Sequence, residues 1–307
     1  MTDTVIDSIL IPTDGSEGAS TGAKRGLEVA DALEATVTVL SVADASALEG
    51  AAGVLESNVE SHRDALEESA RSAAGDVESV AADRFPDLEV RVETERGTPA
   101  QVVSEYVDEV DADLVAMGTS GRSGLERALL GSVTEAVLRT VSVPVLAVPP
   151  SATERSLSRD AVEDVLLPTD DSEGALAAVD VGLDLADEYD ALVHAVYAVD
   201  TRRLRGASVA TGAVDPSDLL SDLERAGDEA LEVVRERARE RGVSVAGRLA
   251  SGSAAEAILE AADETGSDLV VMGTHGRSGL ERQLIGSVTE SVVRGAEVPV
   301  CCVPIEG

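Results

Sequence analysis

The chain has 307 residues, and 24 Lys and Arg against 59 Asp and Glu give it a formal charge of −35. Such a charge repels nucleic-acid backbones and anionic membranes alike, so we expect neither as a partner. A hydrophobic content of 44% is ample for packed cores and excludes global disorder. The length suggests two domains of about 150 residues each.

The acidic, arginine-rich and aromatic-poor composition is typical of halophilic proteins. Lys24 is the sole lysine, and aromatic residues make up 1% of the chain. Molar salt shortens the Debye length to about 3 Å, which makes a high net charge tolerable. We therefore expect a halophilic protein, the alternative being an ordinary acidic cytosolic one. We find no signal-peptide pattern and no apolar run near 18 residues, so we expect a cytoplasmic location.

Strand-like and helix-like segments alternate along the first half. Apolar, β-branched runs predict strands, and apolar positions at helical spacing predict helices. We expect five strands, at residues 5–11, 36–43, 88–94, 114–117 and 143–148. We expect helices between them, at residues 16–34, 55–84, 99–110 and 131–139. Strands joined through helices imply right-handed crossovers and a parallel sheet, so the predicted fold class is α/β.

The second half repeats the first in the same order. The segment ILIPTDGSEGA at residues 9–19 returns as VLLPTDDSEGA at residues 165–175. The segment GTSGRSGLERALLGSVTEAVLR at residues 118–139 returns as GTHGRSGLERQLIGSVTESVVR at residues 273–294. The chain is therefore a tandem duplication.

The duplication sets the expected domain boundaries. Between the two copies lies PPSATERSLSRD, which is rich in proline, serine and charge, as linkers are. We expect one domain at residues 1–150, a linker at 151–162 and a second domain at 163–307. The second domain should repeat the strand and helix order of the first, with its long helix at about residues 216–241.

Three glycines follow the fourth strand of each half at the same spacing, and a serine follows the third. They are Gly118, Gly121 and Gly131 in the first half, and Gly273, Gly276 and Gly286 in the second. Glycine lets the backbone approach an anion closely and adopt positive φ, and the N-terminus of the following helix attracts phosphate. Each copy of the motif carries three arginines against two glutamates. We therefore expect both loops to bind phosphate.

Purely structural explanations stay open for two of these features. Ser132 and Glu135 form a capping box, as does the pair that begins at Ser287, and capping alone would explain a serine at a helix start. Asp14 and its counterpart Asp170 follow the first strand of each half. Either carboxylate could accept hydrogen bonds from a ribose or base, or could close an Asx-turn.

These motifs resemble those of the UspA family of universal stress proteins, in its ATP-binding class. The resemblance covers essentially the whole chain, and its most specific part is the Gly-x2-Gly-x9-Gly-Ser motif, present twice. It implies two tandem Rossmann-like domains of the adenine nucleotide alpha-hydrolase-like kind, each with a five-stranded parallel sheet flanked by helices. It also implies ATP as the ligand, with Mg²⁺ or Mn²⁺ on its phosphates. Together with the composition, it points to a haloarchaeal source.

The resemblance assigns contacts with the nucleotide to matching residues of both halves. Around the phosphates it implies Gly118, Gly121, Arg122, Gly131, Ser132, Val133 and Thr134, and then Gly273, Gly276, Arg277, Gly286, Ser287, Val288 and Thr289. Around the ribose and adenine it implies Asp14, Val42 and Met117, and then Asp170, Ala198 and Met272. In the second half Asp171 replaces Gly15 and Ala198 replaces Val42, so we expect the second site to bind more weakly.

The function implied is a nucleotide-dependent switch in the stress response. ATP would order the loops at residues 118–131 and 273–286 and so alter the surface that a protein partner meets. Slow ATP hydrolysis or phosphotransfer is the enzymatic alternative, and a scaffold that holds the nucleotide only structurally is another. We assign no catalytic residue and no metal ligand, because His62 and His194 lack partners at metal-ligand spacing.

The last strand of each half should lie at a sheet edge, which needs cover. By the same resemblance, we expect residues 143–148 and 298–303 to pair within one chain as a pseudo-two-fold dimer, with a further homodimer left open. The adjacent Cys301 and Cys302 lie in this apolar strand, so we interpret them as core residues.

Overall fold

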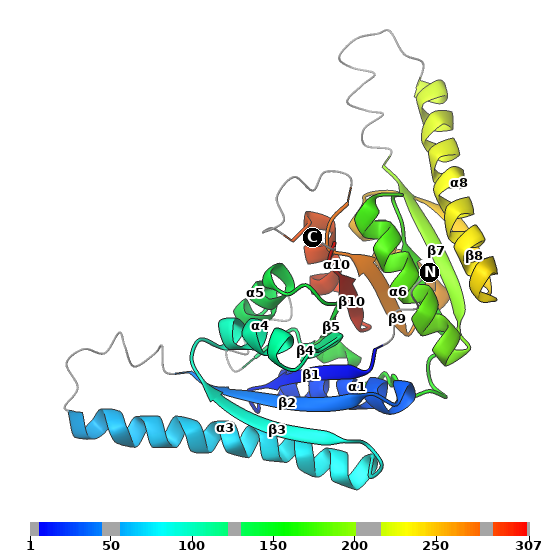
Figure 1. Cartoon of the computed structure of the whole chain (residues 1–307). Helices are drawn as coiled ribbons and strands as arrows, with labels where there is room; N and C mark the ends of the chain where they lie inside the picture. Colours follow the sequence, from blue (N-terminus) through cyan, green and yellow to red (C-terminus); the bar gives the residue numbers. More distant parts are fainter. Residues whose placement is uncertain (1–5, 45–55, 122–129, 201–215, 277–284, 306–307) are drawn as a thin grey trace. The chain divides into compact units, whose positions relative to one another are not determined.

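The computed structural model describes residues 6–44, 56–121, 130–200, 216–276 and 285–305. The chain divides after Arg159 into two compact units. Each unit is an α/β unit in which helices flank a parallel sheet (Figure 1). This confirms the predicted fold class and its tandem repetition. In the described part of the chain, no helix has both the length and the apolar character needed to cross a membrane.

The first unit alternates strands and helices along the chain. Its strands are β1 (Ser8–Thr13), β2 (Thr36–Ala43), β3 (Val90–Arg96), β4 (Leu114–Gly118) and β5 (Val145–Val148). Its helices are α1 (Glu17–Leu33), α3 (Glu56–Arg84), α4 (Pro99–Glu109), α5 (Ser132–Thr140) and the short 3-10 helix η1 (Pro150–Glu154). The strands stand in the order β3-β2-β1-β4-β5, and all neighbouring pairs are parallel.

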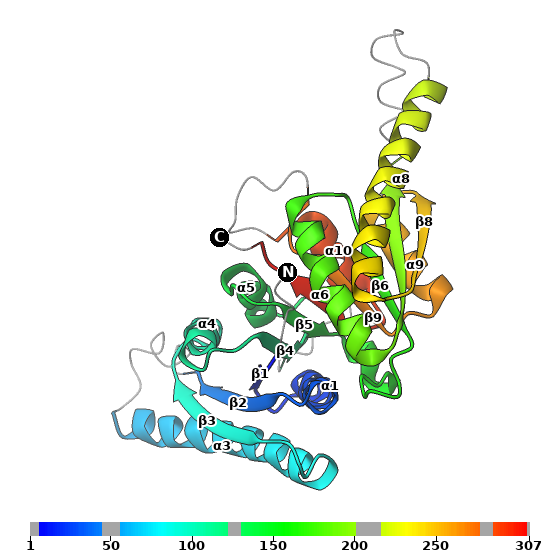
Figure 2. The same cartoon turned by 45° about the vertical axis from the view of Figure 1, so that its right-hand side comes forward.

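The strand order creates a switch point between β1 and β4. From β1 the chain proceeds outward through β2 to β3, and it then returns to the other side of β1 to add β4 and β5. Right-handed crossovers place α1 and α3 on one face of the sheet and α4 and α5 on the other (Figure 2). In open parallel sheets, ligands bind beyond the carboxyl ends of the strands at such a point.

The second unit repeats this arrangement. Its strands are β6 (Asp164–Pro168), β7 (Leu192–Val199), β8 (Val245–Ser251), β9 (Leu269–Gly273) and β10 (Val300–Val303). Its helices are α6 (Glu173–Tyr189), α8 (Pro216–Arg241), α9 (Ala254–Thr265) and α10 (Ser287–Gly295). The strand order β8-β7-β6-β9-β10 is parallel throughout, so the switch point lies between β6 and β9.

Local chemistry explains where these elements begin and end. Helix α1 begins after Ser16, whose hydroxyl accepts a hydrogen bond from the Ala19 amide at 3.2 Å, as an N-cap does. Strand β1 continues to Thr13, two residues past its predicted end, because it stays in register with β2. Strand β3 begins two residues later than predicted, since the Leu88 amide donates to the Phe85 carbonyl in the turn after α3. The predicted segment ends at Val5 and Leu55 lie outside the described residues.

The segment after β5 packs on its own unit. Ala152 and Leu157 are fully buried, and polar contacts with α1 hold the segment in place. Residues 151–159 of the predicted linker therefore lie against the first unit as far as its boundary at Arg159.

Candidate functional site

The residues that follow β1 and β4 meet at the switch point of the first unit. A Cβ placed on Gly121, just after β4, would lie 3.1 Å from Oδ2 of Asp14, just after β1. The other carboxylate oxygen of Asp14, Oδ1, accepts a hydrogen bond from the Ser16 amide at 2.9 Å. The Asx-turn interpretation is therefore confirmed: the turn uses Oδ1, and Oδ2 is the carboxylate oxygen nearest to Gly121.

The structure removes one structural explanation for the serine after the third glycine. The N-cap of α5 is Gly131, and no side chain makes a capping hydrogen bond there. Ser132 is the first helical residue and is exposed, so the predicted capping box is wrong. A capping serine must stand one position before the helix, and glycine occupies that position here. The first amides of α5 therefore receive no hydrogen bond from the side chain of the N-cap residue, and helix amides of this kind can bind an anion.

Backbone and hydroxyl contacts fix the two ends of the loop. The Gly131 amide donates to the Thr119 carbonyl at 2.8 Å, which joins the start of α5 to the end of β4. The buried Thr134 hydroxyl donates to the Gly118 carbonyl at 2.9 Å. Thr134 thus anchors the helix to the strand through its hydroxyl group.

The three motif glycines have no side chain for three different reasons. A Cβ on Gly118 would lie 2.2 Å from the Gly18 carbonyl oxygen, so this glycine allows α1 to cross β4 closely. A Cβ on Gly121 would approach Asp14, and one on Gly131 would lie 3.1 Å from the Thr119 carbonyl oxygen. All three have φ outside the left-handed region, so the expected positive φ is wrong here. Close approach, not backbone conformation, requires these glycines.

The second unit repeats the same geometry. A Cβ on Gly276 would lie 2.7 Å from Oδ2 of Asp170, whose Oδ1 accepts the Ser172 amide at 3.1 Å. Gly286 is the N-cap of α10 without a side-chain cap, and Ser287 is exposed, so the second capping box is wrong too. The Gly286 amide donates to the Thr274 carbonyl at 2.9 Å, and the Thr289 hydroxyl donates to the Gly273 carbonyl at 2.9 Å. Gly273 and Gly276 also lack positive φ, as does Gly286.

The residues expected near the ribose and adenine lie at the same carboxyl edge. Val42 is half-buried near the end of β2, and Met117, the next-to-last residue of β4, is 5% exposed. In the second unit, Ala198 is half-buried near the end of β7, and Met272 is 5% exposed in β9. Val133 and Val288, one residue into α5 and α10, are half-buried. The predicted Arg122 and Arg277 lie outside the described residues.

The two sites differ at the turn before α1 and α6. Gly15 has φ +76°, and a Cβ there would lie 3.1 Å from Cβ of Ala73 in α3. Asp171 occupies the equivalent position with φ +61° and is exposed. Left-handed backbone is unfavourable for a residue with a side chain, although aspartate tolerates it better than most. The second site thus carries an extra carboxylate on a strained turn.

Sequence reasoning did not detect the contact between α1 and the loop. Cβ atoms on Gly18 and Gly22 would lie 2.1 Å from the Ser120 carbonyl oxygen and 2.2 Å from the Gly118 nitrogen. Glycines four residues apart lie on one face of a helix, and that spacing was the available signal.

The remaining candidates have structural roles. Cys301 and Cys302 are 1% and 0% exposed, which confirms them as core residues, and burial raises the pKa of the Cys301 thiol to about 12. His194 pairs with Asp164 through Nε2 at 2.6 Å, at the opposite end of the sheet from the glycine loop. In the described residues, no group of three or more His, Cys, Asp or Glu could hold a metal ion.

Comparisons with known proteins identify the family of the chain. A model of the universal stress protein family matches residues 6–149 and again residues 162–304. Universal stress protein MJ0531 of Methanocaldococcus jannaschii is 39% identical over 140 residues, which are 45% of this chain and 80% of that protein. Universal stress protein Rv2005c of Mycobacterium tuberculosis is 31% identical over 226 residues, which are 73% of this chain and 71% of that protein.

A crystal structure of a universal stress protein from Archaeoglobus fulgidus shares the fold. It superposes with a TM-score of 0.67 at 22% identity, covering 97% of this chain and 98% of that one. Fold and site together define a duplicated α/β protein with a glycine loop at each switch point. The chain belongs to the universal stress protein family, in its tandem two-domain form.

Proposed function

We propose that the protein binds an adenine nucleotide, ATP, at the switch point of each unit. One observation carries the proposal: in both units, the aspartate after the first strand faces the second loop glycine, beside a helix whose N-cap is a glycine that makes no side-chain capping hydrogen bond. Two motifs that lie about 100 residues apart in the sequence thus converge twice on one place. Helix N-terminal amides beside a carboxylate suit a phosphorylated ribose, since amides bind phosphate and a carboxylate accepts from hydroxyl groups.

Different residues of the site would contact the phosphates, the ribose and the adenine of such a ligand. The first amides of α5, with the exposed Ser132, would hold the phosphates, and the small Gly121 would let them approach the backbone. Asp14 Oδ2 would accept from the ribose, and Val42 and Met117 would contact the adenine. In the second unit the same roles fall to Ser287, Gly276, Asp170, Ala198 and Met272.

A divalent cation would be held mainly by the nucleotide itself. Mg²⁺ prefers oxygen ligands, keeps several of its waters and commonly binds through phosphates. We therefore propose Mg²⁺ or Mn²⁺ as part of the bound ATP.

The cellular role that follows is a switch. Nucleotide bound at the loops of residues 118–131 and 273–286 would change the surface that a protein partner meets. We propose a cytoplasmic location for this activity, which two domains, at residues 1–150 and 163–307, would share.

Mass spectrometry of nucleotide released from freshly purified protein tests the proposal. We expect an adenine nucleotide in amounts up to two per chain, since each chain has two loops. The matched control is the double variant Gly121→Val, Gly276→Val, purified in parallel, which should release little. Absence of adenine nucleotide from the native protein, together with failure to take up added ATP, would contradict the proposal.

A further inference from the structure

Residues 150–159, called the strap here, lie across α1 of the first unit. Leu157 is fully buried, and its amide donates to Oε2 of Glu28 at 2.8 Å. Arg25 donates through Nη2 to the Thr153 carbonyl at 2.8 Å. A single turn of α1 thus holds the strap at two points along its length.

The two α1 residues that hold the strap are themselves a buried ion pair. Arg25 is 1% exposed and Glu28 is 3% exposed, and the Arg25 guanidinium donates to Glu28 Oε2. A buried pair of charges is stable only when further hydrogen bonds satisfy both groups. The strap supplies one such bond to each group, so the ion pair and the docked strap depend on each other.

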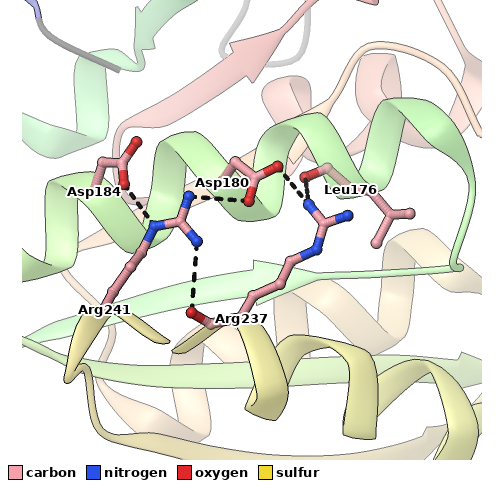
Figure 3. Close-up of polar contacts among 5 residues, drawn as sticks. All are labelled: Leu176, Asp180, Asp184, Arg237 and Arg241. Carbon is pink, nitrogen blue, oxygen red and sulfur yellow. Dashed lines mark hydrogen bonds and ion pairs between the residues drawn. The ribbon is translucent and has the colours of Figure 1, made fainter. Parts of the chain in front are cut away.

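The second unit uses the same helical positions for a different purpose. Val181 and Asp184 of α6 stand where Arg25 and Glu28 stand in α1. Asp184 accepts from Nε of Arg241 at 2.7 Å, which fastens α8 to α6 (Figure 3). Arg237 joins this contact through Asp180 and the Leu176 carbonyl. Within the described residues, the equivalent positions of α6 therefore hold no buried ion pair like that of Arg25 and Glu28.

The N-terminal part of α1 touches the base of the glycine loop without intervening side chains. Gly18 and Gly22 bring the helix backbone against Ser120 and Gly118, at distances that no Cβ could occupy. At the equivalent of Gly22, α6 carries Ala178, which is fully buried. The direct contact at this position is thus also restricted to the first unit.

We propose that α1 couples nucleotide binding at the first site to docking of the strap, the segment that leads toward the second unit. The inference rests on the proposed function. Helix α1 has 17 residues and spans about 25 Å. A displacement of Ser120 on phosphate binding acts directly on Gly18, and Arg25 and Glu28 lie two to three turns further along. Tight packing converts small shifts into a choice between discrete arrangements, here a docked and an undocked strap.

Hydrogen exchange of the full-length chain in molar KCl, with and without saturating Mg-ATP, tests the coupling. We expect ATP to slow exchange at residues 130–138, at the start of α5, and also to slow exchange in the strap at least threefold. Protection of residues 130–138 without any change in the strap would overturn the inference and leave the proposed function standing. Protection of neither segment would mean that the first site does not bind ATP, and both proposals would fall.

Thermodynamic reciprocity provides a second test. If nucleotide stabilises the docked strap, then loosening the strap must weaken nucleotide binding by the same factor. The variant Glu28→Gln is made in a Gly276→Val background, in which only the first site is expected to bind ATP. It should lower the ATP affinity of the first site three- to tenfold and speed hydrogen exchange in the strap. The matched control Asp184→Asn should change neither value. Unchanged affinity in Glu28→Gln, with faster strap exchange and a cooperative thermal transition, would overturn the coupling.

Discussion

The first and second glycines of each loop have different roles. The first is required for packing in the fold, and the second is required for access of the proposed ligand. Gly118 is buried under α1, where a Cβ would meet the Gly18 carbonyl oxygen at 2.2 Å, whereas Gly121 faces a carboxylate oxygen at 3.1 Å. Backbone in a packed helix-to-strand contact cannot yield cheaply, but a carboxylate on a turn can rotate. The same motif therefore contains one glycine for packing and one for access.

Substitution of the first glycine should mainly lower stability, whereas substitution of the second should mainly remove ATP binding. Gly118→Ala should destabilise the protein by about 1–3 kcal/mol, as overpacking does. Gly121→Val should keep the melting temperature close to native but abolish ATP binding at the first site. Thermal melts with calorimetric titration measure both effects. Full ATP binding by Gly121→Val would show that the loop does not hold the phosphates by close backbone approach.

The turn before the first helix of each unit predicts unequal affinities of the two sites. A unit charge at about 6–8 Å in an effective dielectric of about 20 contributes roughly 2 kcal/mol of repulsion, less in high salt. Asp171→Gly removes that charge and relieves a φ of +61°, so it should tighten the second site about tenfold or more at low salt. The reciprocal variant Gly15→Asp should weaken the first site. Titrations at two salt concentrations would contradict this view if Asp171→Gly had no effect at either.

Sequence reasoning singled out the residues of the candidate site but not the physical reason for each residue type. Asp14 and the loop glycines were identified because the same residues recur at the same spacing in both halves of the chain. The sequence could not place Ser132 relative to the start of the helix, since helix boundaries are uncertain by a residue or two. A shift of one residue decides whether Ser132 is the N-cap or the first residue of the helix. Nor could it distinguish the packing glycine Gly118 from Gly121, because that distinction depends on which helix crosses the strand.

At the scale of elements, the pattern of helices and strands was predictable because each has strong periodicity. Strand β2 was predicted at its observed bounds, and α3 at its observed end, Arg84. The strap was not predictable as a packed segment. Its composition is that of a linker, and its docking depends on Arg25 and Glu28, about 130 residues earlier in the chain.

The buried ion pair of α1 makes a stability prediction. Glu28→Ala should destabilise the protein by about 3–5 kcal/mol, because it leaves the Arg25 charge buried without its partner. The double variant Arg25→Val, Glu28→Leu should lose much less, since no unpaired charge remains. Urea denaturation in molar KCl measures both. Equal losses in the two variants would show that packing, and not the uncompensated charge, dominates at this position.

For the whole molecule, the net charge should control how stability depends on salt. A charge of −35 on a compact fold is self-repulsive, and salt screens that repulsion. We expect the melting temperature to fall steadily as KCl is lowered from about 1 M to about 0.1 M, where the Debye length grows from about 3 to 10 Å. A matched titration with a neutral osmolyte at constant low salt separates screening from general stabilisation. A melting temperature independent of KCl would remove the halophilic interpretation.

Calorimetric titration of the full-length chain with Mg-ATP in molar KCl shows whether each unit binds one adenine nucleotide at its switch point. The single-site variants Gly121→Val and Gly276→Val are titrated in parallel. We expect two sites in the native protein, with the first tighter, and the loss of one site in each variant. If the native protein does not bind ATP, or if each variant binds as many molecules of ATP as the native protein, the nucleotide does not bind at these loops.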